Sequence, residues 1–231
     1  MQDASALHLV LTGDPVLYGI VGLSLMVSLT ATGFAALLGA PLGALIALNR
    51  FPGREAMTVA LNALMGLPPV VVGLAVYLLL SRSGPLGAWG LLFTPQAMIV
   101  TQTILVLPII AALTRQTVED LWSEYRDELA AMNVGPWRRV TTLLWDARFS
   151  LLTALLAGFG RAAAEVGSII IVGGNIEGHT RTMTTAIALE TSKGNLALAL
   201  GLGFVLLVII VAVNVAAWLV KRRGAAFEHA T

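Results

Sequence analysis

Five long apolar runs constrain the fold of this chain more than any other feature of its sequence. Four of them contain no charged residue, and one contains two. A membrane-spanning helix needs roughly 20 apolar residues, so each run is long enough to cross a bilayer. We expect the spans at Gly19–Leu48, Ala56–Ser81, Pro95–Thr114, Phe149–Val172 and Leu196–Val220. The sequence therefore predicts an all-α, multi-pass membrane protein, with a sixth membrane segment left open.

The composition supports the same conclusion. Only 12% of the residues are charged and the mean hydropathy is +0.85, whereas soluble domains carry roughly 25% charged residues. We expect one transmembrane domain covering residues 1–231, with one polar loop at residues 115–148 and no room for a soluble catalytic domain. A net charge of +1 gives no case for nucleic-acid binding. The first basic residue is Arg50, so no secretory signal is expected.

Charge asymmetry predicts the orientation of the spans. Basic residues retard the translocation of loops, so the more basic side is cytoplasmic. If the N-terminus lies outside, ten of the 14 basic residues fall in cytoplasmic segments, three fall in external ones, and Arg161 lies within a span. The sequence therefore predicts an external N-terminus and a cytoplasmic C-terminus. The external segment Thr180–Thr191 is expected to form a short helix at or in the outer interface.

Prolines and glycines interrupt the predicted spans. Pro41, the pair Pro68–Pro69 and Pro108 each remove a backbone donor. Such breaks persist in membranes where neighbouring helices or a water-filled cavity satisfy the freed groups. Both packing kinks and helices bent to line a path remain open. Gly39 and Gly43 form a small-xxx-small pair, which predicts a close helix contact.

Sequence motifs for catalysis and metal binding are missing. There is no GxxxxGK[ST] phosphate loop, no HExxH and no GxSxG. The three histidines are scattered and cysteine is absent, which argues against a metal site. Glu165 is the only carboxylate inside a predicted span, whereas paired-acid hydrolysis needs two. We therefore expect no catalytic residues, no bound metal and no ATP site in this chain.

The polar loop between the third and fourth spans predicts a helix, a turn and a second helix. Arg115–Arg148 is 34 residues long and carries 11 charges. Apolar residues recur at helical spacing within it, at Val118, Leu121, Trp122, Tyr125, Leu129 and Met132. Asn133 and Gly135 can end that first helix, because such residues adopt the left-handed conformation of many helix C-termini. Pro136 suits the first turn of the next helix.

The turn resembles the EAA loop of permease subunits of ATP-binding-cassette importers. That signature has an acidic residue, two alanines, three further residues and a glycine. Ala130, Ala131 and Gly135 match it, while Leu129 stands at the usual glutamate position and Glu128 lies one place earlier. The resemblance implies contacts with an ATPase, and the residues that it assigns to coupling are Glu124, Glu128, Ala130, Ala131 and Gly135.

Two further stretches, Leu67–Gly87 and Ala164–Glu190, resemble permeases of oxyanion importers, tungstate types first and molybdate and sulfate types next. The resemblance implies the type I importer permease fold in the cytoplasmic (inner) membrane of a bacterium or an archaeon. It also implies a pathway formed by two permease copies and an external substrate-binding protein. Two cytoplasmic ATPase subunits would bind ATP and Mg²⁺, so no cofactor is expected in this chain.

Two charges lie inside the fourth predicted span. Arg161 and Glu165 are four residues apart, which predicts that they share one helix face. Charges within spans are costly, so they usually face a bundle interior or water. Either they neutralise each other and pack the dimer, or their face lines the path of an anion.

Hydroxyl groups follow the fourth span. Thr182 and Thr184, with Thr180 and Thr185 beside them, offer donors to a dianion near the outer mouth. A polar loop that only contacts the binding protein is the other reading of the same residues.

Two other classes of function remain open at this stage. A channel or secondary carrier would need no ATPase, although carriers usually show inverted repeats, which this sequence lacks. A membrane scaffold would have no continuous polar path. Copurification with an ATPase subunit separates the importer from both. Tungstate is preferred to molybdate on resemblance alone.

Overall fold

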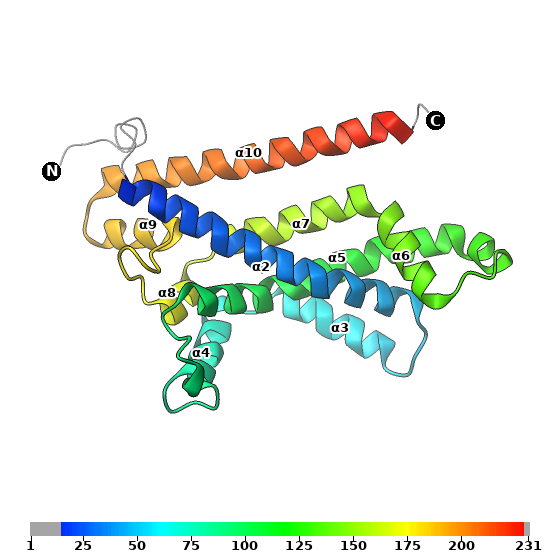
Figure 1. The fold of residues 1–231 in the computed structure, drawn as a ribbon, viewed down its shortest axis with the longest axis horizontal. Helices are drawn as coiled ribbons and strands as arrows, with labels where there is room; N and C mark the ends of the chain where they lie inside the picture. Colours follow the sequence, from blue (N-terminus) through cyan, green and yellow to red (C-terminus); the bar gives the residue numbers. More distant parts are fainter. Residues whose placement is uncertain (1–14, 229–231) are drawn as a thin grey trace. The chain divides into compact units, whose positions relative to one another are not determined.

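The computed structural model describes residues 15–228 and the side chains of residues 16–222, and within this range it is helical without a strand. The α helices are α2 (Pro15–Leu48), α3 (Arg54–Met65), α4 (Pro69–Leu80), α5 (Pro95–Ala131), α6 (Pro136–Asp146), α7 (Arg148–Ala163), α8 (Gly167–Gly173), α9 (Met183–Ser192) and α10 (Leu196–Glu228); one 3-10 turn, η1, covers Gly87–Trp89 (Figure 1). The predicted all-α class is confirmed.

Three helices of the described chain, α2, α5 and α10, are each long and apolar enough to cross a membrane alone. Two pairs of shorter helices, α3 with α4 and α6 with α7, pass the same test together, and each pair is bent at a short break. By length and composition, the described chain thus has three candidate spans, or up to five if each bent pair forms one. This range agrees with the predicted five spans, while the orientation stays a prediction.

The predicted second span is not one helix. Gly66 ends α3, and Pro69 begins α4 after the extended residue Pro68. Proline lacks the backbone donor that a continuing helix needs and disfavours helical geometry in the residue before it. Pro41 and Pro108, by contrast, lie inside the uninterrupted helices α2 and α5.

The third span continues into the polar loop as a single helix. α5 runs from Pro95 to Ala131, so the loop helix expected at Val118–Met132 is its C-terminal part. No glycine or proline occurs between Thr114 and Ala131, so nothing stops the helix where the apolar run ends.

The described residues form two compact units. Unit 1 holds the residues up to Ala31, with Pro68–Gln102 and Gly160–Asn214, and unit 2 holds Thr32–Leu67, Thr103–Phe159 and the residues from Val215. Each unit has its own buried cluster.

Unit 2 contains a buried cluster that joins the end of α2 to the polar loop. Its fully buried members are Ala44, Ala47, Val118, Val140 and Leu143, and partly buried side chains of α5 pack against them, namely Leu121, Trp122, Tyr125 and Leu129. The helical spacing predicted for the loop is therefore confirmed, except that Met132 is 74% exposed.

The glycine pair of α2 makes the close helix contact that the sequence predicts. A Cβ atom on Gly39 would lie 3.1 Å from the carbonyl oxygen of Leu107, and one on Gly43 would lie 2.3 Å from that of Ala111. Two backbones approach this closely only where no side chain intervenes. The pair therefore joins α2 to α5 within unit 2.

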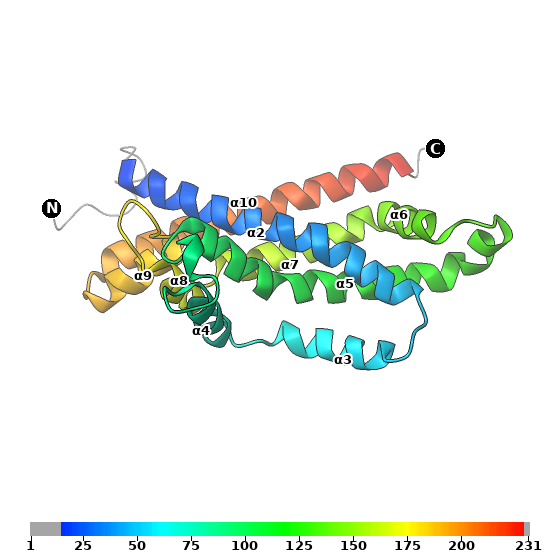
Figure 2. The same ribbon diagram turned by 60° about the horizontal axis from the view of Figure 1, so that its bottom comes forward.

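Unit 1 is built around another close backbone contact. α4 lies against α8 in both ribbon views (Figures 1 and 2), and a Cβ atom on Gly73 would lie 2.7 Å from the Cα atom of Ser168. Elsewhere in this unit, Leu17, Ala186 and Leu202 join α2, α9 and α10 in one buried cluster. The expected short helix near Thr180–Thr191 is present as α9.

Candidate functional site

The α5–α6 turn has a defined backbone. Asn133 adopts the left-handed region with φ 50°, and the Val134 N–H donates to the Leu129 carbonyl at 3.2 Å. Gly135 is extended, with φ −66° and ψ 157°, and Pro136 follows as the first residue of α6. The left-handed residue is thus Asn133 and not Gly135, since asparagine tolerates this region better than most residues.

The residues predicted to couple to an ATPase all lie on the surface. Glu124, Glu128, Ala130, Ala131 and Gly135 are exposed at the end of α5 and in the turn that follows it. A Cβ atom added to Gly135 would meet no atom within 4 Å. The turn is therefore open to a partner, and its surface can be changed at Gly135 without a clash inside the chain.

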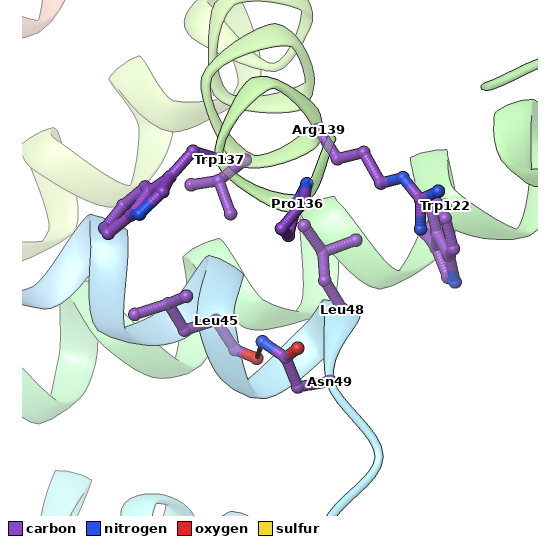
Figure 3. Close-up of a pocket in the computed structure, with 8 residues that line it drawn as sticks. Leu45, Leu48, Asn49, Trp122, Pro136, Trp137 and Arg139 are labelled. Atoms are coloured by element: carbon purple, nitrogen blue, oxygen red, sulfur yellow. Dashed lines mark hydrogen bonds between the residues drawn. The ribbon is translucent and has the colours of Figure 1, made fainter. Parts of the chain in front are cut away.

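An amphipathic groove lies beside this turn. Figure 3 shows its lining residues around a pocket of about 260 Å³, and these are Leu45, Leu48, Asn49, Trp122, Pro136, Trp137, Arg139 and Val140. Arg139 closes one side, with its Nε atom 2.7 Å from the Val134 carbonyl and its guanidinium 5.6 Å from the centre of the Trp122 ring. Trp137 is 70% exposed. An exposed tryptophan and a partly buried arginine beside an amphipathic groove are typical of protein-binding surfaces.

An ion-pair network holds the helices under this groove together. Glu119 of α5 pairs with Arg54 at 2.6 Å and also with Arg115. Arg54 also donates from Nε to the Ile46 carbonyl at 2.8 Å and from Nη2 to the Ala47 carbonyl at 3.3 Å. A cation at these carbonyls suits the negative end of the α2 dipole. The network joins α2, α3 and α5 within unit 2.

The fourth predicted span is broken within unit 1. α7 ends at Ala163 and α8 begins at Gly167, so Glu165 lies in the break. The Glu165 Oε1 atom accepts a hydrogen bond from the Ser168 N–H at 3.1 Å, and its carbonyl accepts one from Thr184 Oγ1 at 2.8 Å. The carboxylate thus satisfies a free donor at the start of α8. The prediction that Arg161 and Glu165 share one helix face is therefore wrong.

Arg161 lies in the last turn of α7 and is half-buried. Within residues 16–222 its guanidinium has no ion-pair or hydrogen-bond partner, and Glu165, the nearest acid in sequence, contacts Ser168 instead. The self-neutralising pair that the spacing suggested is absent from the described structure. A half-buried guanidinium without a counter-ion is costly in an apolar medium.

One carbonyl of the last α7 turn, that of Ala162, has a partner on α5 in addition to the Glu165 N–H. Gln102 Nε2 donates to the Ala162 carbonyl at 3.0 Å, while the Gln102 Oε1 atom is buried without a partner. The Ser168 Oγ atom is also buried and unpaired. Polar atoms of this kind usually mark ordered water or a site that a ligand completes.

The threonines that were expected to lie at an outer mouth are buried and hydrogen-bonded within the protein. Thr182 caps α9 in a capping box with Thr185, and Thr184 holds Glu165 as described above. The Thr180 Oγ1 atom donates to the Gly173 carbonyl at 2.5 Å. Ser24 of α2 accepts the Met183 N–H at 2.7 Å. α9 is thereby tied to both α2 and the α7–α8 break.

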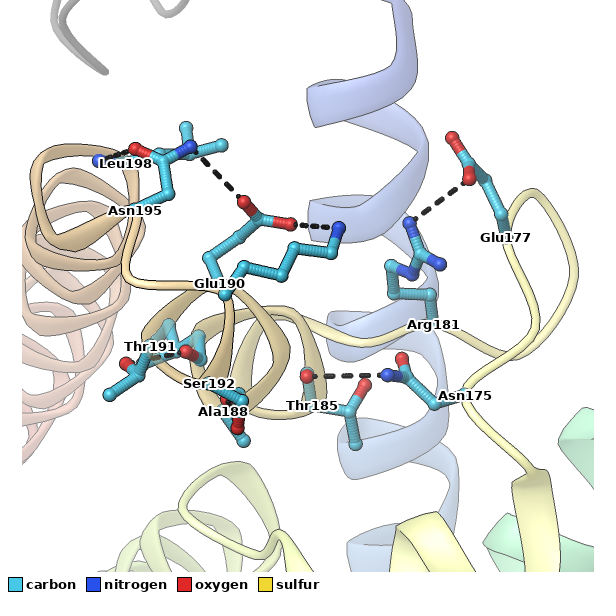
Figure 4. Close-up of polar contacts among 12 residues, drawn as sticks. Asn175, Glu177, Arg181, Thr185, Ala188, Glu190, Thr191, Ser192, Asn195 and Leu198 are labelled. Atoms are coloured by element: carbon cyan, nitrogen blue, oxygen red, sulfur yellow. Dashed lines mark hydrogen bonds and ion pairs between the residues drawn. The ribbon is translucent and has the colours of Figure 1, made fainter.

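Further polar contacts surround α9, as Figure 4 shows. Glu177 lies 3.3 Å from Arg181, and Glu190 accepts hydrogen bonds from Lys193 at 2.8 Å and from Asn195 at 3.1 Å. The hydrogen bond from the Lys193 ammonium holds the pKa of Glu190 below its usual value.

A protein family matches most of this chain. The family model described as "Binding-protein-dependent transport system inner membrane component" covers residues 39–224. The chain belongs to this family. Such membership identifies the chain from the C-terminal part of α2 into α10 as the membrane component of a transport system, and it agrees with the helical architecture described above.

Individual relatives of this transport component are close in sequence. A probable anion ABC transporter permease protein of Haloferax volcanii is 44% identical over 185 residues, which are 78% of this chain and 80% of the relative. The tungstate uptake system permease protein TupB of Peptoclostridium acidaminophilum is 39% identical over 191 residues, or 83% and 84%. A sulfate transport system permease protein, CysW of Synechocystis, is 29% identical over 154 residues, or 63% and 55%. The resemblance to oxyanion permeases is confirmed.

Sequence reasoning missed three structural residues of this transport component. Gln102 carries no motif, and only its rarity as an amide inside an apolar run could have singled it out. Arg54 and Glu119 are far apart in sequence, so their ion pair was not predictable. The i,i+4 spacing of Arg115 and Glu119 was the available signal for the network.

Proposed function

We propose that this chain forms the translocation pathway of an importer for a tetrahedral oxyanion, with tungstate first and molybdate next. The name of the Haloferax relative supports an anion as the transported substrate, and the name of the Peptoclostridium relative supports tungstate. Two copies of the chain would enclose the path. An external binding protein would deliver the anion, and two cytoplasmic ATPase subunits would hold ATP and Mg²⁺. The assembly would lie in the cytoplasmic membrane of a bacterium or an archaeon.

The observation that carries the coupling role is the continuity of α5. One unbroken helix runs from the apolar Pro95 end to the exposed turn at Ala131. A force applied at Glu124, Glu128, Ala130 and Ala131 would therefore displace the spanning part of the same helix. The groove beside Trp122 and Trp137 offers the apolar contact area that docking needs.

The α7–α8 break is proposed to border the anion path. Arg161 supplies a cation without a protein counter-ion and would attract the anion. Glu165, Thr182 and Thr184 hold the break in shape through the hydrogen bonds described above. Because each of the two copies would contribute only one arginine to the path, binding of the dianion would stay weak enough for release, as transport requires.

The coupling role is tested at Gly135, where the structure has open space. Gly135→Asp should place a charge on the docking surface and abolish copurification with the ATPase, with loss of anion uptake. Gly135→Ala is the matched control, since it adds only a methyl group to an extended residue, and it should keep both. Normal copurification and transport by Gly135→Asp would refute the coupling role. The anion held by the binding protein, measured by mass spectrometry, would separate tungstate from molybdate.

A further inference from the structure

α10 is exposed over most of its length, and one of its faces carries a regular row of exposed apolar side chains. Leu200, Phe204, Leu207 and Val211 are between 58% and 75% exposed. Asn214 is the next position in the row and is exposed too. We call these five residues the α10 seam.

The spacing of the seam is that of a helix that pairs with another helix. Its members follow one another at alternate steps of four and three residues, which keeps them on one side of α10 and matches the a and d positions of a heptad. Leu202, which lies on the opposite side, is buried with Leu17 and Ala186. The seam therefore faces away from the core of unit 1.

Asn214 is the polar member of this apolar row. Its Nδ2 atom donates to the Ile210 carbonyl at 2.9 Å, and its Oδ1 atom and second N–H have no partner in the described structure. Lys221 lies seven positions further along α10, which at 1.5 Å per residue places Asn214 about 10 Å inside the basic end of the span. An amide with unused donor and acceptor is costly among lipid tails.

Lipid chains cannot satisfy this amide, whereas a second copy of the chain can. A twofold axis brings the same residue of both copies to the same depth, so each Oδ1 atom can accept from the other amide. We propose that the α10 seam pairs in parallel with the same seam of a second copy, with the two Asn214 side chains hydrogen-bonded to each other. A single asparagine in such a row fixes the register of the two helices.

This inference rests on the two-copy assembly proposed above and adds the surface through which the copies meet. The chain has no cysteine, so one introduced thiol reports on one position. Val211→Cys lies on the seam, and Ala212→Cys is the matched control, because it is exposed at the same depth and about 100° around the helix. Each variant is oxidised in native membranes as part of the whole transporter. Val211→Cys should give the covalent two-copy species at least about fivefold more than Ala212→Cys, since disulfides form only at short Cβ separations.

The role of the amide is measured in the same background. Asn214→Leu, added to Val211→Cys, should lower the cross-linked fraction about threefold, because the interhelical hydrogen bond is lost. Equal cross-linking of the two cysteine variants would overturn the proposed pairing of the two α10 seams. So would the absence of cross-linking in Val211→Cys when two copies still copurify with the ATPase, and this result would leave the proposed function intact. Purified complexes that contain only one copy would overturn both proposals.

Discussion

The Thr184 hydroxyl of α9 donates to the backbone carbonyl of Glu165 at 2.8 Å, across 19 positions of sequence. This hydrogen bond connects α9 to the break between α7 and α8. The same Glu165 uses its carboxylate to satisfy the Ser168 N–H. The spacing of the sequence suggests that Glu165 pairs with Arg161. In the structure, the buried Glu165 instead accepts the hydrogen bonds that stabilise the α7–α8 break.

We predict that Thr184→Val destabilises the chain. The substitution keeps the shape of the side chain and leaves a buried carbonyl unpaired, which costs about 1–3 kcal/mol. Thr191→Val is the control, because the Thr191 hydroxyl is exposed and bonds only within its own helix. The free energies of unfolding of the two variants are compared in detergent with a chemical denaturant. Equal losses of unfolding free energy in the two variants would contradict a stabilising role for the hydrogen bond between Thr184 and Glu165.

Gly43 permits the contact between α2 and α5, and Gly43→Ala should separate them. The new methyl group would lie 2.3 Å from the Ala111 carbonyl oxygen, and overpacking of this kind costs about 1–3 kcal/mol. Gly33→Ala on the same helix meets no atom within 4 Å, so its stability should be unchanged or rise by up to about 1 kcal/mol. The midpoints of thermal unfolding report the difference. A similar midpoint for both variants would show that the close approach is dispensable.

Arg161→Ala should lower anion uptake by about tenfold or more, because a charge-assisted contact with the passing anion is lost. Arg82→Ala removes an exposed cation from the loop after α4 and should leave uptake within about twofold of the parent, as isolated surface charges contribute little. Uptake is measured in vesicles, together with the yield of assembled complex. Unchanged uptake, or loss of assembly in place of transport, would argue that Arg161 only packs the protein.

The Glu190–Lys193 pair should make stability depend on pH. Because the lysine lowers the pKa of Glu190 in the folded chain, the pair stabilises the fold above the ordinary glutamate pKa of about 4.3. That contribution disappears as the pH falls through the lowered folded value. Lys193→Met should therefore lower the unfolding temperature at pH 7 but not at the acid end of the range. The effect is small, up to about 1 kcal/mol, since Lys193 is largely exposed. An equal decrease in unfolding temperature at every pH would contradict a stabilising ion pair between Glu190 and Lys193.

The spans and the α5–α6 turn were readable from the sequence because their signals are local. Apolar runs define the long helices, Pro136 marks the start of α6, and Asn133 is one of the few residues that accept a left-handed turn. The end of α5 was placed within one residue, but its continuity was missed: the sequence suggested a span ending at Thr114 and a separate loop helix at Val118–Met132, whereas α5 runs unbroken from Pro95 to Ala131. An apolar run ends where the lipid ends, but a helix ends only where its backbone changes direction.

The α7–α8 break was not predictable from its own residues. RAAAEVG favours a continuous helix by propensity, and Arg161 and Glu165 have the spacing of an ion pair. The break is held instead by Thr184 and Gln102, which come from distant parts of the chain. Contacts of this kind leave no periodic signal, so hydropathy and spacing alone gave one span where the structure has two helices.

We propose that a separate ATPase drives transport through the exposed end of α5. The most direct measurement is anion uptake into vesicles that contain this chain, with the binding protein outside and ATP inside, compared with and without the ATPase subunits. We expect uptake only when the ATPase, ATP and the loaded binding protein are all present. Equal uptake by the chain alone would contradict it.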